Sequence, residues 1–348
     1  MTRVGVIFGG RSSEREASLA SGRQVYFNLD PSKYERLAIF MDQHGHLWHV
    51  PDKLVIQNTT NDIASRVASD ATRIPYEDLK ELVDVVFIAL HGKYGDDGCI
   101  QGLLELIDVP YTGSGVLPCA VSMDKPTAHQ LLKEAGLEVA RELVVTQREW
   151  QSDPDAVTHH IAEEVGFPCV VKPTREGSSI GVSVVQEAGE LPNAMATALE
   201  WDTGALIEEF MAGMEFSVII VGNDEPEAFI PTETTTTNPY LTYDDKYMPG
   251  RSQKITPARV DQAILKRLQA EALKAHKALG FTGYSRIDGF LLEDGRILLT
   301  DPNSTSGMAP SSFMFHQAAE AGLTPMMLVD KIVQLAQEAH TEKKGPLA

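Results

Sequence analysis

The sequence predicts an α/β protein built from more than one domain. The chain has 348 residues, 43% of them apolar, and at roughly 150 residues per domain this length indicates two or three domains. Residues 4–8 form a short apolar run that ends at Gly9-Gly10 and precedes a helical pattern over residues 17–28. Residues 85–90 repeat the apolar run and end at His91-Gly92. A strand, a glycine turn and a helix start open an α/β unit, so these observations predict the fold class.

The remaining pattern divides the chain into three segments, residues 1–121, 122–212 and 213–348. Further strands are expected at 109–111, 142–146, 169–172, 181–186, 206–209, 215–221, 285–292 and 297–300. Further helices are expected at 101–107, 125–135, 261–279, 314–321 and 324–338. Residues 234–257 are polar and lack a convincing period, which is typical of a functional or a disordered loop.

Charge and composition exclude several classes of protein. The net charge of −19, from 49 Asp and Glu against 30 Lys and Arg, argues against binding to nucleic acid or to an anionic membrane. We find no run of about 18 apolar residues, and the apolar start is too short for a signal peptide. The three cysteines have no metal-binding spacing, and their odd number fits a reduced compartment. We therefore expect a cytoplasmic protein, and the net charge leaves small-molecule chemistry open because a local cluster of Lys and Arg can still bind phosphate.

The strongest candidate site combines Arg286-Ile-Asp288 with Asp301-Pro-Asn303. Period-two alternation places Arg286 and Asp288 on one face of a strand, and Asp301 and Asn303 on one face of the next. Two carboxylates and an amide oxygen suit Mg²⁺, which prefers oxygen ligands. The alternative is a solvated hairpin face. Carboxylates on neighbouring strands repel each other unless a cation lies between them, which favours the metal site.

A second candidate is a phosphate-binding loop. Lys172 ends an apolar strand and is followed by a turn that contains Ser178 and Ser179 between glycines. Backbone N–H groups and hydroxyls of such a turn can bind phosphate oxygens, although this is not the Walker pattern. A plain glycine-rich hairpin turn is the alternative. Lys125 could supply a second cation to the same nucleotide, or be an ordinary solvated lysine.

Acidic side chains mark two further candidate positions. Glu208, Glu209 and Glu215 lie at the edge between a strand and a linker, where they could hold an adenine and a ribose or form an exposed acidic hinge. Glu14 precedes a helix, where a carboxylate could hold a substrate ammonium group or simply cap the helix.

Two polar segments complete the set. The segment from Ser304 through Gly307 to Ser312 precedes a helix, so it could bind an anion or contain only an N-cap serine. Lys246 and Tyr247 lie in the long 234–257 loop, where they could belong to a lid or anchor the loop by packing.

These motifs, in this order, resemble the D-alanine–D-alanine ligase family of ATP-grasp enzymes, and the resemblance spans nearly the whole chain. The motifs are Phe-Gly-Gly-Arg-Ser-Ser-Glu-Arg-Glu at 8–16, Ala-Leu-His-Gly-Lys-Tyr-Gly-Asp-Asp-Gly at 89–98, Gln-Gly-Leu-Leu-Glu-Leu at 101–106, Tyr-Thr-Gly-Ser-Gly-Val at 111–116, Ser-Met-Asp-Lys at 122–125, Val-Lys-Pro-Thr-Arg-Glu-Gly-Ser-Ser-Ile-Gly at 171–181, Asp-Lys-Tyr at 245–247 and Ser-Arg-Ile-Asp-Gly at 285–289.

The resemblance implies three α/β domains with ATP between the central and C-terminal ones, and a homodimer. It implies synthesis of the peptidoglycan precursor D-alanyl-D-alanine from two D-alanines through an acyl phosphate, with ATP and two Mg²⁺ or Mn²⁺ ions. For ATP, the resemblance implies that Lys125, Lys172, Ser178, Ser179 and Lys246 bind phosphate, that Glu208, Glu209 and Glu215 bind adenine and ribose, and that Asp288, Asp301 and Asn303 bind metal. For the amino acids, it implies that Glu14 and His91 bind the first substrate, that Arg286 and Gly307 stabilise the oxyanion, and that Ser312 binds the second carboxylate. Ser178 is implied to link Glu14 to Tyr247.

Two departures from the family pattern concern the acceptor and the metal. Asp301 stands where the family has Glu, and residues 303–307 read Asn-Ser-Thr-Ser-Gly where the family has Asn-Thr-x-Pro-Gly. A different acceptor, such as D-serine or D-lactate, therefore stays open, as does a nucleotide-binding paralogue without activity. Tyr247 stands where D-lactate-preferring ligases of the family place a histidine. A tyrosine stays neutral near pH 7, so we expect a dipeptide and not an ester.

Overall fold

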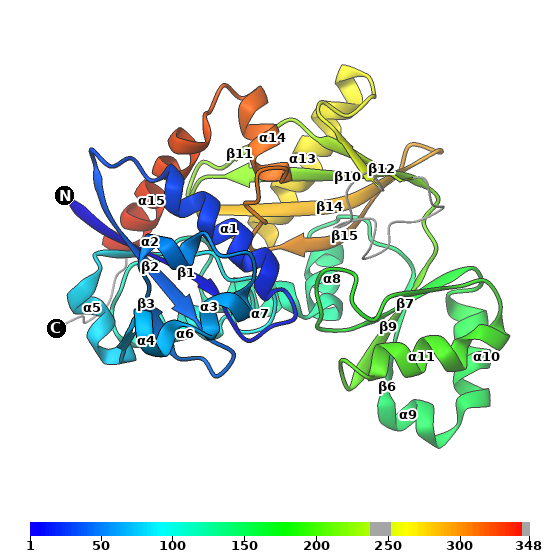
Figure 1. Ribbon diagram of the computed structural model, residues 1–348. Helices are drawn as coiled ribbons and strands as arrows, with labels where there is room; N and C mark the ends of the chain where they lie inside the picture. Colours follow the sequence, from blue (N-terminus) through cyan, green and yellow to red (C-terminus); the bar gives the residue numbers. More distant parts are fainter. Residues whose placement is uncertain (237–251, 343–348) are drawn as a thin grey trace.

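The computed structural model describes residues 1–236 and 252–342, which fold around three β-sheets (Figure 1). The N-terminal sheet has the order β4-β3-β2-β1-β5, in which β1 pairs in parallel with both β2 and β5. Its strands and the helices around it are β1 Thr2–Gly9, α1 Arg15–Asn28, β2 Tyr34–Met41, β3 Leu47–His49, α2 Asp52–Val55, α3 Thr60–Ala64, α4 Val67–Asp70, β4 Thr72–Ile74, the 3₁₀ helix η1 Tyr76–Asp78, α5 Leu79–Leu82, β5 Val85–Ile88 and α6 Cys99–Leu106.

The second sheet is four-stranded and antiparallel, with the order β6-β9-β7-β8. The elements that lead into it and build it are α7 Val116–Met123, α8 Lys125–Glu134, β6 Glu142–Thr146, α9 Gln147–Ser152, α10 Pro154–Glu164, β7 Cys169–Pro173, β8 Ser183–Val185, η2 Ala188–Glu190, α11 Leu191–Leu199 and β9 Gly204–Glu209. α10 and α11 bury Ile161, Ala194 and Met195 against this sheet.

The third sheet is six-stranded and antiparallel, with the order β13-β12-β10-β14-β15 and β11 paired on β10. Its elements are β10 Gly213–Val221, β11 Glu227–Ala228, β12 Thr232–Thr236, β13 Ser252–Ile255, α13 Gln262–Ala278, β14 Tyr284–Leu292, β15 Ile297–Asn303, α14 Phe313–Glu320 and α15 Pro325–Thr341. One face packs on α13 and also on α8, whose Ala128 and Leu132 join the same buried cluster as Phe216.

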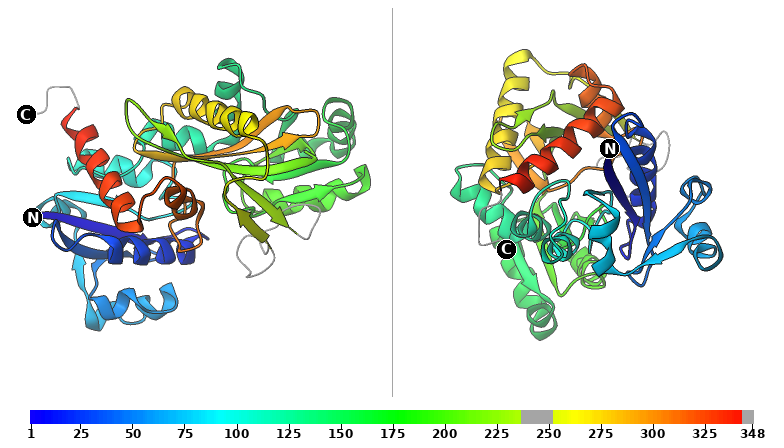
Figure 2. Two further views of the ribbon diagram at one scale, coloured as in Figure 1. Left: turned by 90° about the horizontal axis from the view of Figure 1, so that it is seen from above. Right: turned by 90° about the vertical axis from the view of Figure 1, so that its left-hand side faces the viewer.

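Helix α15 returns to the beginning of the chain. Its Val329 and Ile332 lie in one buried cluster with Val6 of β1 and Phe87 of β5. Both views of Figure 2 place α15 (red) beside β1 and α1 (blue). Lys33 Nζ also pairs with Asp330 Oδ2 at 2.8 Å. The N-terminal sheet therefore completes its core with residues from the far end of the described chain.

The sequence predicted about half of these elements and missed, among others, β2, β3, β4, α10 and α11, and three of its predictions need correction. Residues 109–111 were expected to form a strand, but only Tyr111 makes an isolated bridge to Val86. The strand expected at 181–186 is confined to β8, Ser183–Val185. The loop expected over 234–257 is bounded by strand residues on both sides, because β12 and β13 pair with each other. Residues 237–251 lie outside the described part of the chain.

Candidate active site

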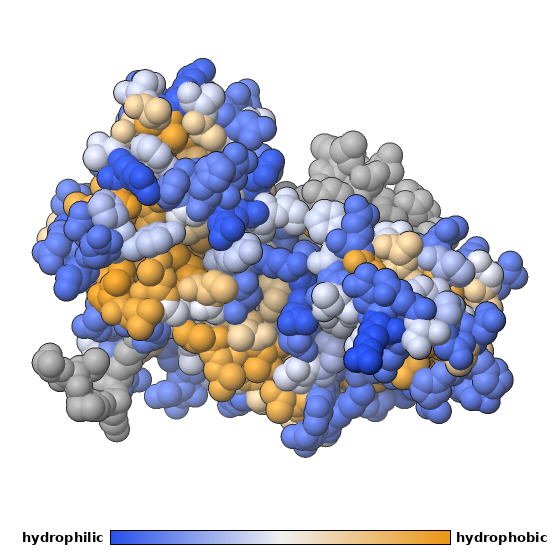
Figure 3. Space-filling view, turned by 90° about the horizontal axis from the view of Figure 1, so that it is seen from below, coloured by the Kyte–Doolittle hydropathy of each residue, from blue (hydrophilic) through white to orange (hydrophobic). Residues whose placement is uncertain are grey.

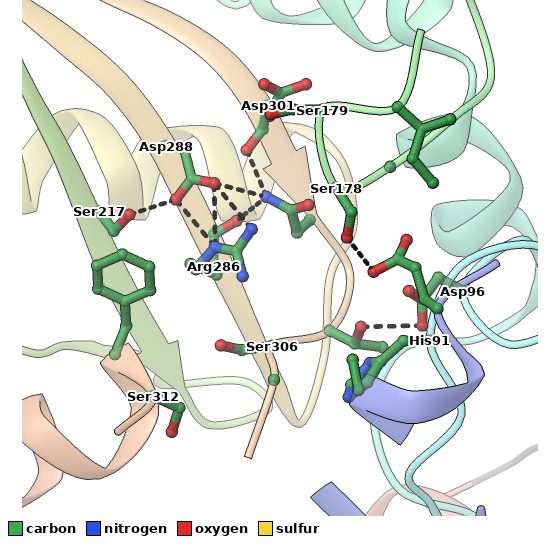
Figure 4. A pocket seen from close by; sticks show the side chains of 18 of the residues that line it. His91, Asp96, Ser178, Ser179, Ser217, Arg286, Asp288, Asp301, Ser306 and Ser312 are labelled. Carbon is green, nitrogen blue, oxygen red and sulfur yellow. Dashed lines mark hydrogen bonds and ion pairs between the residues drawn. The ribbon is translucent and has the colours of Figure 1, made fainter. Parts of the chain in front are cut away.

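A cavity of about 480 Å³ lies where the three sheets meet, and side chains from all three line it (Figure 4). Most of the predicted site residues belong to its wall. They are Glu14, His91, Lys125, Lys172, Ser178, Ser179, Glu215, Arg286, Asp288, Asp301, Asn303, Gly307 and Ser312. The fold therefore brings together residues that lie almost 300 positions apart in the sequence.

The acidic patch has the arrangement that strand alternation predicted. In the β14–β15 pair, Asp288 stands opposite Asp301 and Arg286 stands opposite Asn303. Arg286 Nη2 lies 2.9 Å from Asp288 Oδ2, and Asn303 Nδ2 donates to the same oxygen at 3.1 Å. A β-bulge follows Asp288 in the register. Bulges redirect side chains beside functional sites, which is consistent with this convergence.

The donor set of this patch fits a hard divalent cation. Carboxylate and amide oxygens from neighbouring strands are the ligands that Mg²⁺ takes, with substrate phosphates completing its shell. Ser217 Oγ, which was not predicted, donates to Asp288 Oδ1 at 2.6 Å and fixes that carboxylate from β10. A hydrogen bond to a metal-binding carboxylate orients it, so Ser217 supports the same site.

The buried Lys172 and the partly buried Lys125 face the acidic patch. Lys172 Nζ lies 2.7 Å from Glu208 Oε2 and 3.9 Å from Asp301 Oδ1. Burial lowers the pKa of Lys172, but Asp301 and Glu208 outweigh that effect and raise it overall. Burial also lowers the pKa of Lys125, whose Nζ donates to the backbone oxygen of Glu176. The lysines give the cavity two cationic groups beside the acidic patch.

The glycine-serine turn approaches Glu14 closely. Ser178 donates a hydrogen bond to Glu14, which is the contact that was expected between them. A Cβ atom on Gly177 would lie 2.4 Å from Glu14 Oε1, so a larger residue there would force the Glu14 carboxylate to move. Ser178 and Ser179 have φ values of 52° and 58°, a left-handed conformation that is uncommon for serine and is found at functional turns. Glu14 is the N-cap residue of α1, but its side chain makes no capping hydrogen bond.

His91 connects the first helix to the 304–308 segment. Ser21 Oγ lies 2.7 Å from His91 Nε2 and accepts a hydrogen bond from the Met308 amide at 2.9 Å. Burial, and then the charge of Arg286, lowers the pKa of His91 to about 4, so the ring is neutral near pH 7. A neutral ring does not repel a substrate ammonium group. The link also holds the backbone near Gly307 in place.

Asp96 lines the cavity, but no role was predicted for it, although it belongs to the motif at residues 89–98. Its carboxylate accepts hydrogen bonds from the Gly92 amide at 2.8 Å and from Thr305 Oγ1 at 2.9 Å. Burial, and then the nearby Glu14, raises the pKa of Asp96 to about 8. One of the carboxyl groups in the cavity, that of Asp96, therefore keeps its proton to a pH well above the usual range for aspartate.

We expect Asp96→Asn to stabilise the protein increasingly as the pH rises. Between about pH 4 and about pH 8 the folded Asp96 holds a proton that the unfolded chain has released, so stability falls across that window. Asparagine removes this titration. Melting temperatures of both proteins should differ little near pH 4 and most above pH 8. Asp30→Asn is a control of opposite sign, because hydrogen bonds from Ser32 lower the pKa of Asp30. A pH-independent difference for Asp96→Asn would contradict the assignment.

Two predicted residues that the structure describes, Glu208 and Glu209, do not line this cavity. Glu208 is buried behind Lys172, and its Oε1 accepts no hydrogen bond from the described chain. Glu209 points to the opposite face of β9, where it binds Arg141 Nε at 2.8 Å. Lys246 and Tyr247 lie outside the described residues.

Glu208 also belongs to a cluster with His129 and Glu142, in which the nitrogen and oxygen atoms that could bind a metal ion lie close together. His129 Nδ1 is 2.6 Å from Glu142 Oε2, and His129 Nε2 is 2.5 Å from the Thr300 carbonyl. Two ligands on one zinc ion stand roughly 3.3 Å apart in tetrahedral geometry, so 2.6 Å marks a hydrogen bond. His129 Nδ1 also lies 3.7 Å from Glu208 Oε1, so we interpret this cluster as a buried polar network beside Glu208.

Comparison with known proteins agrees with this geometry. The family model for the D-ala D-ala ligase N-terminus matches residues 3–114, and the model for the D-ala D-ala ligase C-terminus matches residues 131–334. The chain is 34% identical to the D-alanine–D-alanine ligase of Geobacillus thermodenitrificans, over 99% of this chain and 97% of that protein. It is 39% identical to the D-alanine–D-alanine ligase of Syntrophobacter fumaroxidans, over 96% and 97%.

Solved structures show the same fold. The VanG D-Ala:D-Ser ligase from Enterococcus faecalis superposes with a TM-score of 0.86 and 30% identity, covering 96% of this chain and 99% of that one. The D-alanine–D-alanine ligase from Coxiella burnetii superposes with a TM-score of 0.84 at 24% identity, covering 98% and 95%. The chain belongs to the D-alanine–D-alanine ligase family and has its ATP-grasp fold.

Proposed function

We propose that this protein joins two D-alanine molecules into D-alanyl-D-alanine, a peptidoglycan precursor, and converts ATP to ADP and phosphate. The observation that carries the proposal is the shared cavity. It combines two lysines for phosphate, an oxygen-rich patch for metal, and a carboxylate, Glu14, for an ammonium group. An enzyme that activates an amino acid with ATP needs all three.

The first step is transfer of the γ-phosphoryl group. A carboxylate oxygen of the first D-alanine forms a bond to the γ-phosphorus, the bond to the β-phosphate oxygen breaks, and ADP leaves with an acyl phosphate remaining. Lys125, Lys172 and the Ser178–Ser179 turn hold the phosphates, as does Lys246. Asp288, Asp301 and Asn303 would hold two Mg²⁺ or Mn²⁺ ions, and these would supply positive charge against the triphosphate.

The second step forms the amide bond. The second D-alanine loses an ammonium proton, its nitrogen bonds to the acyl carbon, and the bond from that carbon to the phosphate oxygen then breaks. Arg286 and the Gly307 amide stabilise the negative oxygen of the tetrahedral intermediate. Ser312 holds the second carboxylate. Its Oγ accepts from the Phe315 amide at 3.4 Å as the cap of α14, so its own hydrogen remains available to donate.

Substrate and nucleotide are positioned from opposite sides of the cavity. Glu14 holds the ammonium group of the first D-alanine, with the neutral His91 beside it and Ser178 as the link to Tyr247. Glu208, Glu209 and Glu215 serve the adenine and ribose. Glu208 acts through Lys172, to which its Oε2 is paired, and Glu209 can contribute only its backbone because Arg141 binds its side chain.

The alternative to an enzyme is a catalytically inactive paralogue that only binds nucleotide. The presence of both lysines, Arg286 and the whole acidic patch in one cavity favours the enzyme. Phosphate release from ATP that depends on D-alanine, with the dipeptide identified by mass, tests this directly. A protein that binds ATP but forms neither product would overturn the proposal.

We expect the dipeptide to dominate over the ester when D-alanine and D-lactate are supplied in equal amounts at pH 7. Tyr247 is neutral at that pH, so it does not repel an acceptor ammonium group as a cationic histidine would. Mass analysis of the products gives the ratio. Tyr247→Phe keeps the ring and removes the hydroxyl that would reach Ser178, so it should lower turnover. A predominant ester product from the wild-type protein would contradict the expectation.

We also propose that the protein is a cytoplasmic homodimer. No described helix is long and apolar enough to cross a bilayer. Apolar side chains gather on the face seen in Figure 3, over the part of the N-terminal domain where α6 and α7 lie. Leu106 on α6 is 88% exposed and Leu117 on α7 is 72% exposed. A second copy that covers these helices would remove that apolar surface from water.

A further inference from the structure

The Ser306 hydroxyl lies at the cavity and has no hydrogen-bond partner among the described residues. The residue is 2% exposed, and its Oγ is buried without a hydrogen-bond partner among the described residues. It nevertheless lines the cavity. Figure 4 shows it in the space between Arg286, Ser312 and His91. A buried hydroxyl without a partner costs about 1–3 kcal/mol, so a ligand that supplies the missing hydrogen bond regains that free energy.

The neighbouring polar side chains of this segment do have partners. Ser304 Oγ donates to the Asp96 carbonyl at 3.4 Å, and Thr305 Oγ1 donates to the Asp96 carboxylate at 2.9 Å. Ser306 is therefore the residue of the 304–306 segment whose polar group is left for a ligand. The family pattern stated above has proline at this position, which has no side-chain donor.

We propose that Ser306 gives the acceptor subsite a selectivity for amino acids with a hydrogen-bonding group on the β-carbon, of which D-serine is the simplest. The inference rests on the proposed function. Ser306 directly precedes Gly307, which contributes the oxyanion amide, and it lies in the segment that ends at Ser312, which holds the acceptor carboxylate. A side chain between these two groups faces the second amino acid. Sites that hydrogen-bond a substrate hydroxyl discriminate strongly against the analogue that lacks it.

The test compares acceptors in a mixture. The wild-type protein, Ser306→Ala and Ser304→Ala are each given ATP with equal amounts of D-alanine and D-serine, and mass analysis measures the ratio of D-alanyl-D-serine to D-alanyl-D-alanine. We expect Ser306→Ala to lower this ratio by on the order of tenfold, the effect of one lost hydrogen bond. Ser304→Ala is the matched control, because it removes an equally buried hydroxyl that already has a partner, and it should leave the ratio unchanged.

The outcomes separate this inference from the proposed function. A ratio unchanged by Ser306→Ala, an equal loss of both products, or no D-serine product from the wild type would overturn the inference. Failure to form any dipeptide from D-alanine alone would instead overturn the proposed function. The melting temperature provides a second measurement. Removing a hydroxyl that lacks a partner should not lower it, whereas a clear decrease would show that Ser306 Oγ is bonded within the protein.

Discussion

Asp288→Asn is expected to reduce D-alanine-dependent phosphate release by at least about 10²-fold, because a metal ion at a transferring phosphoryl group supplies several kcal/mol of charge stabilisation. Asp288 is the centre of the acidic patch and is bonded by Ser217, Arg286 and Asn303. Asparagine keeps the shape of the side chain but removes its charge. Turnover measured over a range of Mg²⁺ concentrations, with circular dichroism as a check on folding, gives the result.

Two further variants of the same hairpin serve as controls for that experiment. Asp294→Asn removes a carboxylate that lies in the β14–β15 turn and pairs with Arg296 at the surface, so turnover should not change. Asp301→Glu restores the longer carboxylate of the family and should be tolerated. Near-normal turnover in Asp288→Asn would show that the oxygen-rich patch does not hold the catalytic metal.

Lys172→Met is expected to abolish ATP binding and to lower the free energy of unfolding by about 3–5 kcal/mol, the usual cost of leaving a buried charge without its partner. Lys172 and Glu208 have side-chain exposures of only 7% and 2%, and their charged atoms lie 2.7 Å apart. Methionine fills the same volume without charge. Chemical denaturation measures the stability, and calorimetric titration with ATP measures the binding.

The double variant Lys172→Met/Glu208→Gln distinguishes the two effects. It removes the unpaired carboxylate, so much of the lost stability should return while ATP binding stays absent. Lys133→Met is the control, because Lys133 pairs with Glu142 but is 49% exposed, and exposed pairs contribute little. A single Lys172→Met variant with wild-type stability would contradict the role of this pair in the fold.

The sequence predicted elements that have a clear local period, or that are apolar runs followed closely by a glycine turn, and missed many of the others. The alternation in residues 285–292 and 297–303 was enough to pair β14 with β15 and to place Asp288 near Asp301. Strand β2 was not predicted, although it lies at the centre of the N-terminal sheet between β1 and β3. Its inner end is apolar on successive residues, since both faces of that sheet are covered, and such a run has no period-two signature.

Site residues were predictable where the residue type itself indicates the chemistry. They were not predictable where the role of a side chain depends on a partner that is distant in the sequence. Strand alternation places Glu208 and Glu209 on opposite faces of the strand, but only the folded structure shows that Glu209 pairs with Arg141. Asp96 lies in a loop whose sequence has no period, and its raised pKa arises from burial and from Glu14, 82 positions away. The free hydroxyl of Ser306 is likewise visible only once the bonds of its neighbours are known.

The packing of α15 on the N-terminal sheet has a consequence for biosynthesis. β1 and β5 are complete by residue 88, whereas α15 begins at residue 325. At a translation rate of roughly 5–20 residues per second, the ribosome needs roughly 10–50 s to cover that interval. During this time α1 and the segment that contains α2, α3 and α4 cover part of the cluster that includes Val6 and Phe87, and the apolar surface later buried by α15 stays exposed. The N-terminal domain is therefore the first to begin folding and among the last to finish.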